Sequence, residues 1–260
     1  MNFAPKLIAL DVDGTIVDVH NFMTPAVRDS VRAAAEAGIH IVISTGRSIP
    51  AVINAIEKVG LVDGLAVASN GAVVFSYDPP KVLHAITFDA SEAVQLVLEQ
   101  VPDAIVAVEE LGVGYRVNKP FPYGEINGQM KLESVYELIA QPVTRVIIRA
   151  PEHSPESFSK MVHNLGLEGT NYFIGYTAWL DLAPEGVSKA SGLELVCTEL
   201  GVTAADVLAI GDGFNDLEMI EWAGRGVAMG QAPDGLKDLA DHVTGRIDED
   251  GAAQEIRRYL

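Results

Sequence analysis

Two acidic residues stand at the end of a short apolar run near the start of the chain, in the stretch LIALDVDGTIVD (residues 7–18). Asp11 and Asp13 lie two residues apart, and Gly14 and Thr15 follow them. The apolar run predicts a buried strand, so the two carboxylates would lie close together at its end. Keeping like charges together costs free energy unless a positive group joins them. The stretch therefore indicates a site that holds a cation or a basic side chain.

Further polar residues follow other predicted strands. The segment STGR follows one strand, and GDGFND follows a later one and supplies Asp212 and Asp216. Lys189 lies near the start of a predicted helix. Four carboxylates gathered at one site would repel each other, and a hard divalent cation with oxygen ligands resolves this repulsion, which suits Mg²⁺. Lys189 would neutralise the remaining charge or meet an anionic substrate.

The residues beside these acids suit the binding of phosphate. Gly46, Gly211 and Gly213 allow the backbone to approach a ligand closely, and exposed backbone N–H groups can hold a phosphate. Thr45 offers a hydroxyl group to a phosphoryl oxygen. A cation, a lysine, N–H donors and a carboxylate nucleophile are together the parts of a phosphoryl-transfer site.

Strand and helix patterns alternate at both ends of the chain. Strands are predicted at 6–12, 39–45, 64–71, 72–75, 206–213 and 226–230. Helices are predicted at 24–38, 48–59, 188–201, 215–224, 232–242 and 251–260. This alternation predicts an α/β fold with a doubly wound, Rossmann-like parallel sheet, in which ligands bind at the carboxyl ends of the strands. The residues at these ends are Asp11, Asp13, Thr45 and Asp212.

The middle of the chain has a different pattern. Strands are predicted at 84–88, 104–110, 114–118, 145–150 and 172–183, and helices at 91–100 and 154–166. Because several of these strands follow one another directly, we expect an inserted α+β domain with antiparallel pairs. The segments 77–81 and 182–186 contain Pro and Gly and are predicted to be hinge-like linkers. The predicted domains are a discontinuous core of residues 1–80 and 185–260 and an insertion at 81–184.

Composition narrows the classes of function. With 260 residues, 48% of them hydrophobic, the chain can bury a sizeable core. A net charge of −18 argues against nucleic acid or an anionic membrane as a partner. The single cysteine, Cys197, excludes an internal disulfide and favours a reducing, cytoplasmic compartment. The sequence contains no run that resembles a signal peptide or a membrane span, and it leaves open whether the protein is a monomer or a homodimer.

The four motifs together resemble a known family. DVDGT, STGR, a lone lysine before ASGL, and GDGFND, in this order and spacing, resemble the haloacid dehalogenase superfamily of phosphatases. The insertion resembles the larger, C2-type cap, and the chain looks like a Cof-type member of this group. The motif resemblance covers about half of the chain, whereas the cap matches only in position, size and rough pattern. The family resemblance implies a Mg²⁺-dependent phosphomonoester hydrolase that acts on a small phosphorylated metabolite.

The resemblance also implies roles that the residues alone left open. Asp11 would be the nucleophile that forms an aspartyl-phosphate, Asp13 the general acid and then base, and Lys189 the residue that holds Asp11 and the phosphate. The residues expected at the phosphate are Thr45, Gly46, Arg47 and Asn215, although Arg47 could instead cap a helix. Mg²⁺ would be held by the Asp11 carboxylate, the Asp13 backbone carbonyl and Asp212, with Asp216 supporting the metal through water or an outer contact.

Two alternatives remain open, together with the substrate. A phosphomutase of the same superfamily would return the phosphoryl group to a sugar, and a non-catalytic protein would only bind the phosphorylated metabolite. Hexose phosphates, phosphoglycolate, pyridoxal phosphate and flavin mononucleotide all remain candidate substrates. In the cap, the residues considered for contact with substrate are Glu109, Arg116, Asn118 and Lys119, and the favoured interpretation is that they are exposed polar residues of strands.

Overall fold

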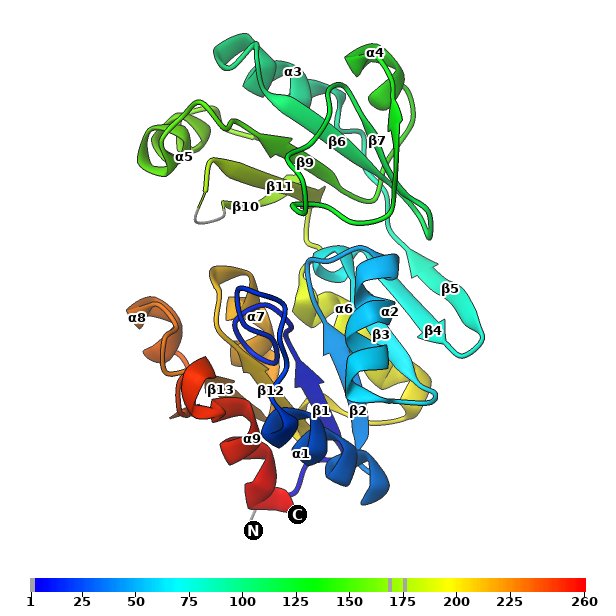
Figure 1. Ribbon diagram of the computed structural model, residues 1–260, viewed down its shortest axis with the longest axis vertical. Helices are drawn as coiled ribbons and strands as arrows, with labels where there is room; N and C mark the ends of the chain where they lie inside the picture. Colours follow the sequence, from blue (N-terminus) through cyan, green and yellow to red (C-terminus); the bar gives the residue numbers. More distant parts are fainter. Residues whose placement is uncertain (1–2, 168–169, 175–176) are drawn as a thin grey trace. The chain divides into compact units, whose positions relative to one another are not determined.

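The structure is a computed structural model that describes residues 3–167, 170–174 and 177–260. The chain separates into two compact units (Figure 1). The first unit contains the described residues up to Arg47, together with Val52–His84 and Ser188–Leu260, and the second contains Ser48–Ala51 and Ala85–Val187. Within the described residues, no helix is both long and apolar enough to cross a membrane.

The first unit is built on one mixed sheet. Its strands, in spatial order, are β14 (His242–Val243), β13 (Arg225–Ala228), β12 (Val207–Gly211), β1 (Leu7–Leu10), β2 (His40–Ser44), β3 (Leu65–Ala68), β4 (Val73–Tyr77) and β5 (Pro80–Ala85). The pairs from β14 to β3 are parallel, and β4 runs antiparallel to β3. Every residue of β1 and β12 is buried, as expected of central strands that are covered on both faces.

Helices cover both faces of this sheet. They are α1 (Pro25–Glu36), α2 (Ile49–Val59), α6 (Lys189–Leu200), α7 (Leu217–Trp222), α8 (Asp234–Lys237) and α9 (Gly251–Ile256). Short 3₁₀ turns lie at Ser69–Gly71, Ala204–Asp206, Phe214–Asp216, Ile247–Glu249 and Arg257–Tyr259. Figure 1 shows α1 (blue) and α9 (red) in front of the sheet and α6 (yellow) behind it. Cys197 of α6 is buried in the apolar cluster between α6, α7 and the sheet, as predicted.

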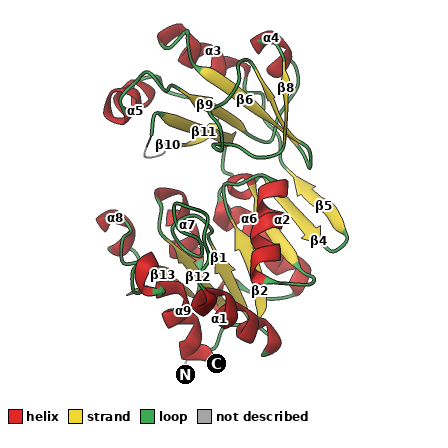
Figure 2. Ribbon diagram, in the orientation of Figure 1, coloured by secondary structure: helices red, strands yellow, loops and turns green. Residues whose placement is uncertain are grey.

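The second unit is an α+β layer with mostly antiparallel strands. Its sheet has the order β10 (Thr170–Ile174), β11 (Trp179–Pro184), β9 (Val146–Arg149), β6 (Ile105–Glu110), β7 (Gly114–Val117) and β8 (Gln129–Leu132). Only β7 and β8 pair in parallel. Its helices are α3 (Ser91–Gln100), α4 (Val135–Leu138) and α5 (Pro155–His163), and they pack on one face of the sheet through a shared apolar cluster (Figure 2).

These two architectures confirm the predicted fold class, a doubly wound α/β sheet with an inserted α+β unit. The local signals act as expected in α1, where Thr24 accepts a hydrogen bond from the Val27 N–H at 3.2 Å and Pro25 occupies the first turn. The chain leaves the first unit after His84 and returns at Ser188.

Several predicted elements differ from the structure. The strand predicted at 172–183 is two antiparallel strands, β10 and β11, and its residues Gly175 and Tyr176 lie outside the described residues. The predicted linker at 77–81 is mostly the ends of β4 and β5, and the one at 182–186 contains the end of β11. The strand predicted at 84–88 is wrong, because β5 ends at Ala85 and Phe88 makes only an isolated bridge to Val143.

Candidate active site

Asp11 lies where β1 ends and is held against the neighbouring strand. Its N–H donates to the Ile210 carbonyl of β12 at 3.0 Å, and its side chain is buried. The apolar strand residues before it are completely buried, so the chain has little freedom to move this carboxylate toward water. The sequence thus places the Asp11 carboxylate at the end of a buried strand, next to the apolar core.

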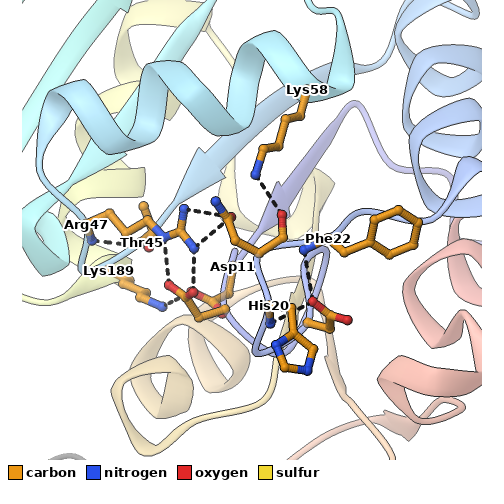
Figure 3. Close-up of polar contacts among 10 residues, drawn as sticks. Asp11, His20, Phe22, Thr45, Arg47, Lys58 and Lys189 are labelled. Carbon is orange, nitrogen blue, oxygen red and sulfur yellow. Dashed lines mark hydrogen bonds and ion pairs between the residues drawn. The ribbon is translucent and has the colours of Figure 1, made fainter. Parts of the chain in front are cut away.

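Lys189 is the positive group that meets this charge. It is the first residue of α6, directly after the N-cap Ser188, and its side chain is fully buried. Its Nζ donates to Asp11 Oδ1 at 2.6 Å (Figure 3). It also donates to Asp216 Oδ1 at 2.6 Å. Burial alone would lower the pKa of Lys189, but attraction by Asp11 and Asp216 overcomes this and raises the pKa above its ordinary value. Lys189 therefore stays protonated.

Asp216 organises the loop that follows β12. Its Oδ2 accepts the N–H groups of Asp212 and Gly213, each at 2.9 Å, while its Oδ1 accepts from Lys189. A Cβ on Gly211 would collide with the Asp216 carboxylate, so this close packing requires glycine. Both oxygens of Asp216 already have donors, which suits a supporting role for this residue.

Asp11, Asp212 and Asp216 form a carboxylate cluster. One oxygen from each can be chosen so that all three lie within 4.8 Å of one another. Burial raises the pKa of Asp212 to about 6, with repulsion by Asp216 adding to it. Burial also raises the pKa of Asp11 well above its ordinary value, although Lys189 acts in the opposite direction. The cluster thus holds more negative charge than Lys189 balances.

Asp13 is not one of the three acids of this cluster and pairs instead with Arg47. Arg47 donates from Nη2 to Asp13 Oδ1 at 2.5 Å and from Nε to Asp13 Oδ2 at 2.8 Å. The guanidinium also contacts Asn21 Oδ1 at 3.3 Å, and Lys58 donates to the Asn21 carbonyl at 2.7 Å (Figure 3). The Asp13 side chain is 63% exposed, which suits exchange with a substrate in water.

The loop that carries Asn21 is held by hydrogen bonds to the side chain of Asp18. Asp18 Oδ1 accepts the N–H groups of His20 and Phe22, each at 2.9 Å (Figure 3). These bonds to the ionised form lower the pKa of Asp18, the larger contribution coming from Phe22. The loop therefore has its own local support, and it presents Asn21 to Arg47.

Thr45, Gly46 and Asn215 meet around Asn70, at the end of β3. Thr45 Oγ1 accepts the Arg47 N–H at 3.2 Å, and the Thr45 carbonyl accepts the Asn70 N–H at 3.1 Å. Asn215 Nδ2 donates to Asn70 Oδ1 at 3.0 Å. A Cβ on Gly46 would lie 2.9 Å from the same oxygen, so Asn70 packs directly against that glycine. Three of the residues predicted to contact phosphate, Thr45, Gly46 and Asn215, therefore lie around Asn70. The fourth, Arg47, lies in the same unit but is paired with Asp13.

Gln231 also belongs to this region and was missed by sequence reasoning. Its Nε2 donates to the Gly14 carbonyl at 2.6 Å and lies 3.4 Å from Asp212 Oδ2. No motif singles out a lone glutamine. The available signal was its position, because it follows the predicted strand 226–230 at the same edge of the sheet.

The residues considered for substrate contact in the insertion have partners within the second unit. Arg116 donates to Glu133 at 3.0 Å, and Lys119 donates to the Asp103 carbonyl at 2.9 Å. Asn118 Oδ1 accepts the Val106 N–H of β6 at 2.8 Å, and its Nδ2 donates to the Ala104 carbonyl, just before β6, at 3.2 Å. Glu109 is buried, contrary to the interpretation of it as an exposed polar residue, and it accepts from Thr144 at 3.0 Å.

The fold and this site define a class: a doubly wound α/β protein with acids at the ends of its parallel strands and a lysine among them. Residues 8–256 match the family model of haloacid dehalogenase-like hydrolases, so the chain belongs to that family. The predicted enzyme class, a phosphatase of this superfamily, is thereby confirmed.

Individual relatives agree with this assignment. Pyridoxal phosphate phosphatase YbhA of Escherichia coli is 32% identical, in an alignment covering 98% of this chain and 98% of the relative. The 5-amino-6-(5-phospho-D-ribitylamino)uracil phosphatase YcsE of Bacillus subtilis is 27% identical over 98% of this chain and 96% of its own length. A solved haloacid dehalogenase-like hydrolase from Bacteroides thetaiotaomicron superposes with a TM-score of 0.80 at 25% identity and covers 98% of this chain and 100% of that structure.

Proposed function

We propose that this protein is a Mg²⁺-dependent phosphomonoester hydrolase that acts on a small phosphorylated metabolite through an aspartyl-phosphate on Asp11. The observation that carries the proposal is the buried Lys189, which contacts Asp11 and Asp216 within the carboxylate cluster. A chain that only needed to fold would not bury two acids and a lysine beside the half-buried Asp212, because uncompensated buried charge is strongly unfavourable.

The donor set fits a magnesium ion. All the candidate ligands are oxygens, and the raised pKa of Asp212, about 6, reflects burial and repulsion that a divalent cation would relieve. Asp11, Asp212 and the Asp13 backbone carbonyl would hold the ion, and Asp216 would fix the loop that carries Asp212. When bound, Mg²⁺ would neutralise the charge that builds up on the transferring phosphoryl group.

The proposed reaction uses the two acids of the first loop in the roles that the family resemblance implies. The Asp11 carboxylate attacks phosphorus, the ester P–O bond breaks, and Asp13 gives a proton to the leaving oxygen. Asp13 then takes a proton from water, which attacks phosphorus, breaks the acyl phosphate and restores Asp11. Because Arg47 holds both oxygens of Asp13, that pair must loosen first, and the substrate phosphate is an anion that can draw Arg47 away.

The remaining residues bind and orient the phosphoryl group. Lys189 would hold Asp11 and a phosphoryl oxygen, while Thr45 and the Gly46 N–H would contact the others. Asn215, oriented by Asn70, is placed to donate as well. Such fixed donors in a site of low polarity contribute more to rate than the proton transfers do.

The organisation of the enzyme is part of the same proposal. Residues 1–80 and 185–260 would be the catalytic core, and 81–184 a C2-type cap that selects the leaving group. The substrate would be a small phosphorylated metabolite, such as a sugar phosphate or phosphoglycolate. The relatives named as phosphatases of phosphorylated metabolites support this broad class. The single cysteine supports a cytoplasmic location, and the net charge of −18 disfavours nucleic acid as a partner.

The test is phosphate release from a panel of small phosphomonoesters, measured with Mg²⁺, with a chelator, and with Asp11→Asn. We expect turnover that requires Mg²⁺ and falls by at least about 10⁴-fold in Asp11→Asn. Asp234→Asn is the matched control, because that side chain is 98% exposed in the same unit. If folded, metal-loaded protein released no phosphate from any ester, plain hydrolysis would be wrong. Phosphoryl exchange between sugars would then indicate a mutase, and binding alone a non-catalytic protein.

A further inference from the structure

Gln231 joins three separate segments of the first unit through one amide group. Its Nε2 donates to the Gly14 carbonyl at 2.6 Å and lies 3.4 Å from Asp212 Oδ2. Its Oε1 accepts the Ile247 N–H at 3.0 Å. The partners are 217, 19 and 16 residues away in sequence, so the amide joins segments that lie far apart along the chain.

The orientation of this amide is determined by its partners. The Ile247 N–H can only donate, so the amide oxygen must face it. The Gly14 carbonyl and the Asp212 carboxylate can only accept, so the amide nitrogen must face them. All three contacts agree on the same orientation, and the reverse one would put an oxygen against two acceptors.

The backbone beneath Gln231 is also fixed. The Met229 N–H donates to the Gly211 carbonyl at 2.9 Å, and the Gly230 N–H donates to the Gly245 carbonyl at 3.0 Å. Gln231 thus extends from a segment that is tied to the end of β12, next to Asp212. Because this backbone is already fixed, only the side-chain torsions of Gln231 have to be ordered for the amide to hold its partners.

The two main partners lie where a metal site would be assembled. Gly14 follows Asp13, and its φ of +83° allows a turn that brings it against Asp212, where a Cβ would collide with the carboxylate. Holding the Gly14 carbonyl fixes the backbone beside the Asp13 carbonyl, and the longer contact to Asp212 limits rotation of that carboxylate. The same amide therefore sets the distance between two expected ligands.

We infer that Gln231 is a positioning residue that sets the Mg²⁺ affinity of the site by holding the Gly14 turn and the Asp212 carboxylate at a fixed distance from each other. This inference rests on the proposed function, because it assumes that these groups hold the metal. Residues that orient metal ligands typically change metal affinity by about 10- to 100-fold when they are removed. We therefore expect Gln231→Ala to weaken Mg²⁺ binding by about this factor.

The experiment is calorimetric titration of the full-length protein with Mg²⁺ alone, without substrate. It compares wild type, Gln231→Ala, Gln231→Met and Gln231→Asn. Gln231→Met keeps the length of the side chain but removes its donor and acceptor, so we expect it to match Gln231→Ala. Gln231→Asn keeps the amide but is one methylene shorter, so an intermediate affinity is expected.

Gln254→Ala is the matched control. Gln254 lies in the same unit, is exposed, and donates to the Glu249 carbonyl at 2.7 Å. Its removal should leave Mg²⁺ affinity within about twofold of wild type, because only a contact to the metal site is expected to change affinity by about 10-fold or more. This control separates loss of any glutamine hydrogen bond from loss of this one.

The outcomes separate the inference from the proposal on which it rests. Weaker binding in Gln231→Ala and Gln231→Met, with Gln254→Ala unchanged, supports the inference. Wild-type affinity in both Gln231 variants overturns it and leaves the proposed function intact. If wild type itself does not bind Mg²⁺, the metal site is wrong and the inference falls with it. Unfolding of both Gln231 variants, seen by circular dichroism, would make Gln231 a folding determinant and would also overturn the inference.

Discussion

In the first unit, Lys189 contacts two carboxylates of a cluster of three, whereas in the second unit Arg145 makes a two-bond ion pair with Asp181. We call Arg145, Asp181, Tyr115 and Trp179 the arginine cluster. Arg145 donates to the Tyr115 hydroxyl at 3.0 Å, and the Trp179 indole donates to Asp181 Oδ2 at 3.1 Å. Both oxygens of Asp181 thus have donors that the protein itself supplies.

The two clusters differ in how far the protein's own side chains balance their buried charges. Burial lowers the pKa of Arg145, but attraction by Asp181, with Tyr115 and Glu109 adding to it, raises the pKa above its ordinary value. In the carboxylate cluster, by comparison, the pKa values of Asp11 and Asp212 are raised because burial and repulsion exceed what Lys189 offers. A buried charge that is balanced by other side chains of the protein stabilises the fold. A buried cluster with an excess of one charge is typical of a site that binds a ligand of the opposite charge.

The largest expected effect comes from neutralising one acid in each cluster. Asp181→Asn should lower the free energy of unfolding of the second unit by about 3–5 kcal/mol, because it leaves Arg145 buried without its partner. Asp11→Asn, in metal-free protein, should leave the free energy of unfolding of the first unit unchanged or higher, because it removes one of several repelling carboxylates.

Urea unfolding with a chelator measures both, and the chain offers a separate probe for each unit. Trp222 lies in the first unit and Trp179 in the second. Trp179→Phe therefore leaves a probe of the first unit, and Trp222→Phe a probe of the second. A loss of several kcal/mol in Asp11→Asn would remove the contrast between the clusters.

Mg²⁺ should stabilise the first unit alone. At 100 times its dissociation constant, a ligand that binds only the folded state adds about 2.7 kcal/mol to the free energy of unfolding. The Trp222 signal should shift by this amount and the Trp179 signal should not. Asp212→Asn is the control and should lose the shift. An equal shift in both signals would contradict a metal site confined to the carboxylate cluster.

A glycine comparison measures how tightly the carboxylate cluster is packed. Gly14 and Gly112 both have positive φ, +83° and +72°, but a Cβ would collide with Asp212 at Gly14 and, among the described residues, would meet nothing within 4 Å at Gly112. Gly112→Ala should cost about 1 kcal/mol from backbone strain alone. Gly14→Ala should cost about 2 kcal/mol and also weaken Mg²⁺ binding. Equal costs in urea unfolding would mean that Asp212 moves aside freely.

The carboxylate cluster was more accessible to sequence reasoning than the arginine cluster. Asp11, Asp212 and Lys189 stand in short motifs at strand and helix ends, and the geometry of parallel sheets brings such ends together. Arg145, Tyr115 and Asp181 lie on or beside three antiparallel strands, where their meeting depends on strand register. Register within the insertion could not be derived from isolated strand signals.

The strand β8, Gln129–Leu132, was missed although its polar and apolar residues alternate. It is only four residues long, and every residue is exposed at the edge of its sheet, so it buries no apolar face. Within the helix predicted at 232–242 the structure has only one helical turn, α8, whose buried residue is Leu236. Gln231 was missed for a related reason, since its three partners are brought to it only by the complete fold.

The smallest effect tests whether Tyr115 is part of a balanced cluster. Tyr115→Phe removes an acceptor from Arg145 and should cost about 1 kcal/mol at neutral pH. Burial raises the pKa of Tyr115 above its ordinary value of 10.0, although Arg145 acts in the opposite direction. The stability that follows from this shift is fully present below about pH 10 and is lost as pH rises through the folded-state pKa.

Wild type should therefore lose stability in the second unit above about pH 10 more steeply than Tyr115→Phe does, because the phenol must lose its proton in a buried place. Urea unfolding at several alkaline pH values, followed by Trp179 fluorescence, measures the difference. Tyr123→Phe is the control, since Tyr123 is fully exposed in the same unit. Parallel pH profiles for wild type and Tyr115→Phe would mean that Arg145 stabilises the phenolate as well as it does the phenol. The arginine cluster would then hold an excess of positive charge, and the distinction between a balanced and an unbalanced cluster would fail on the side of the second unit.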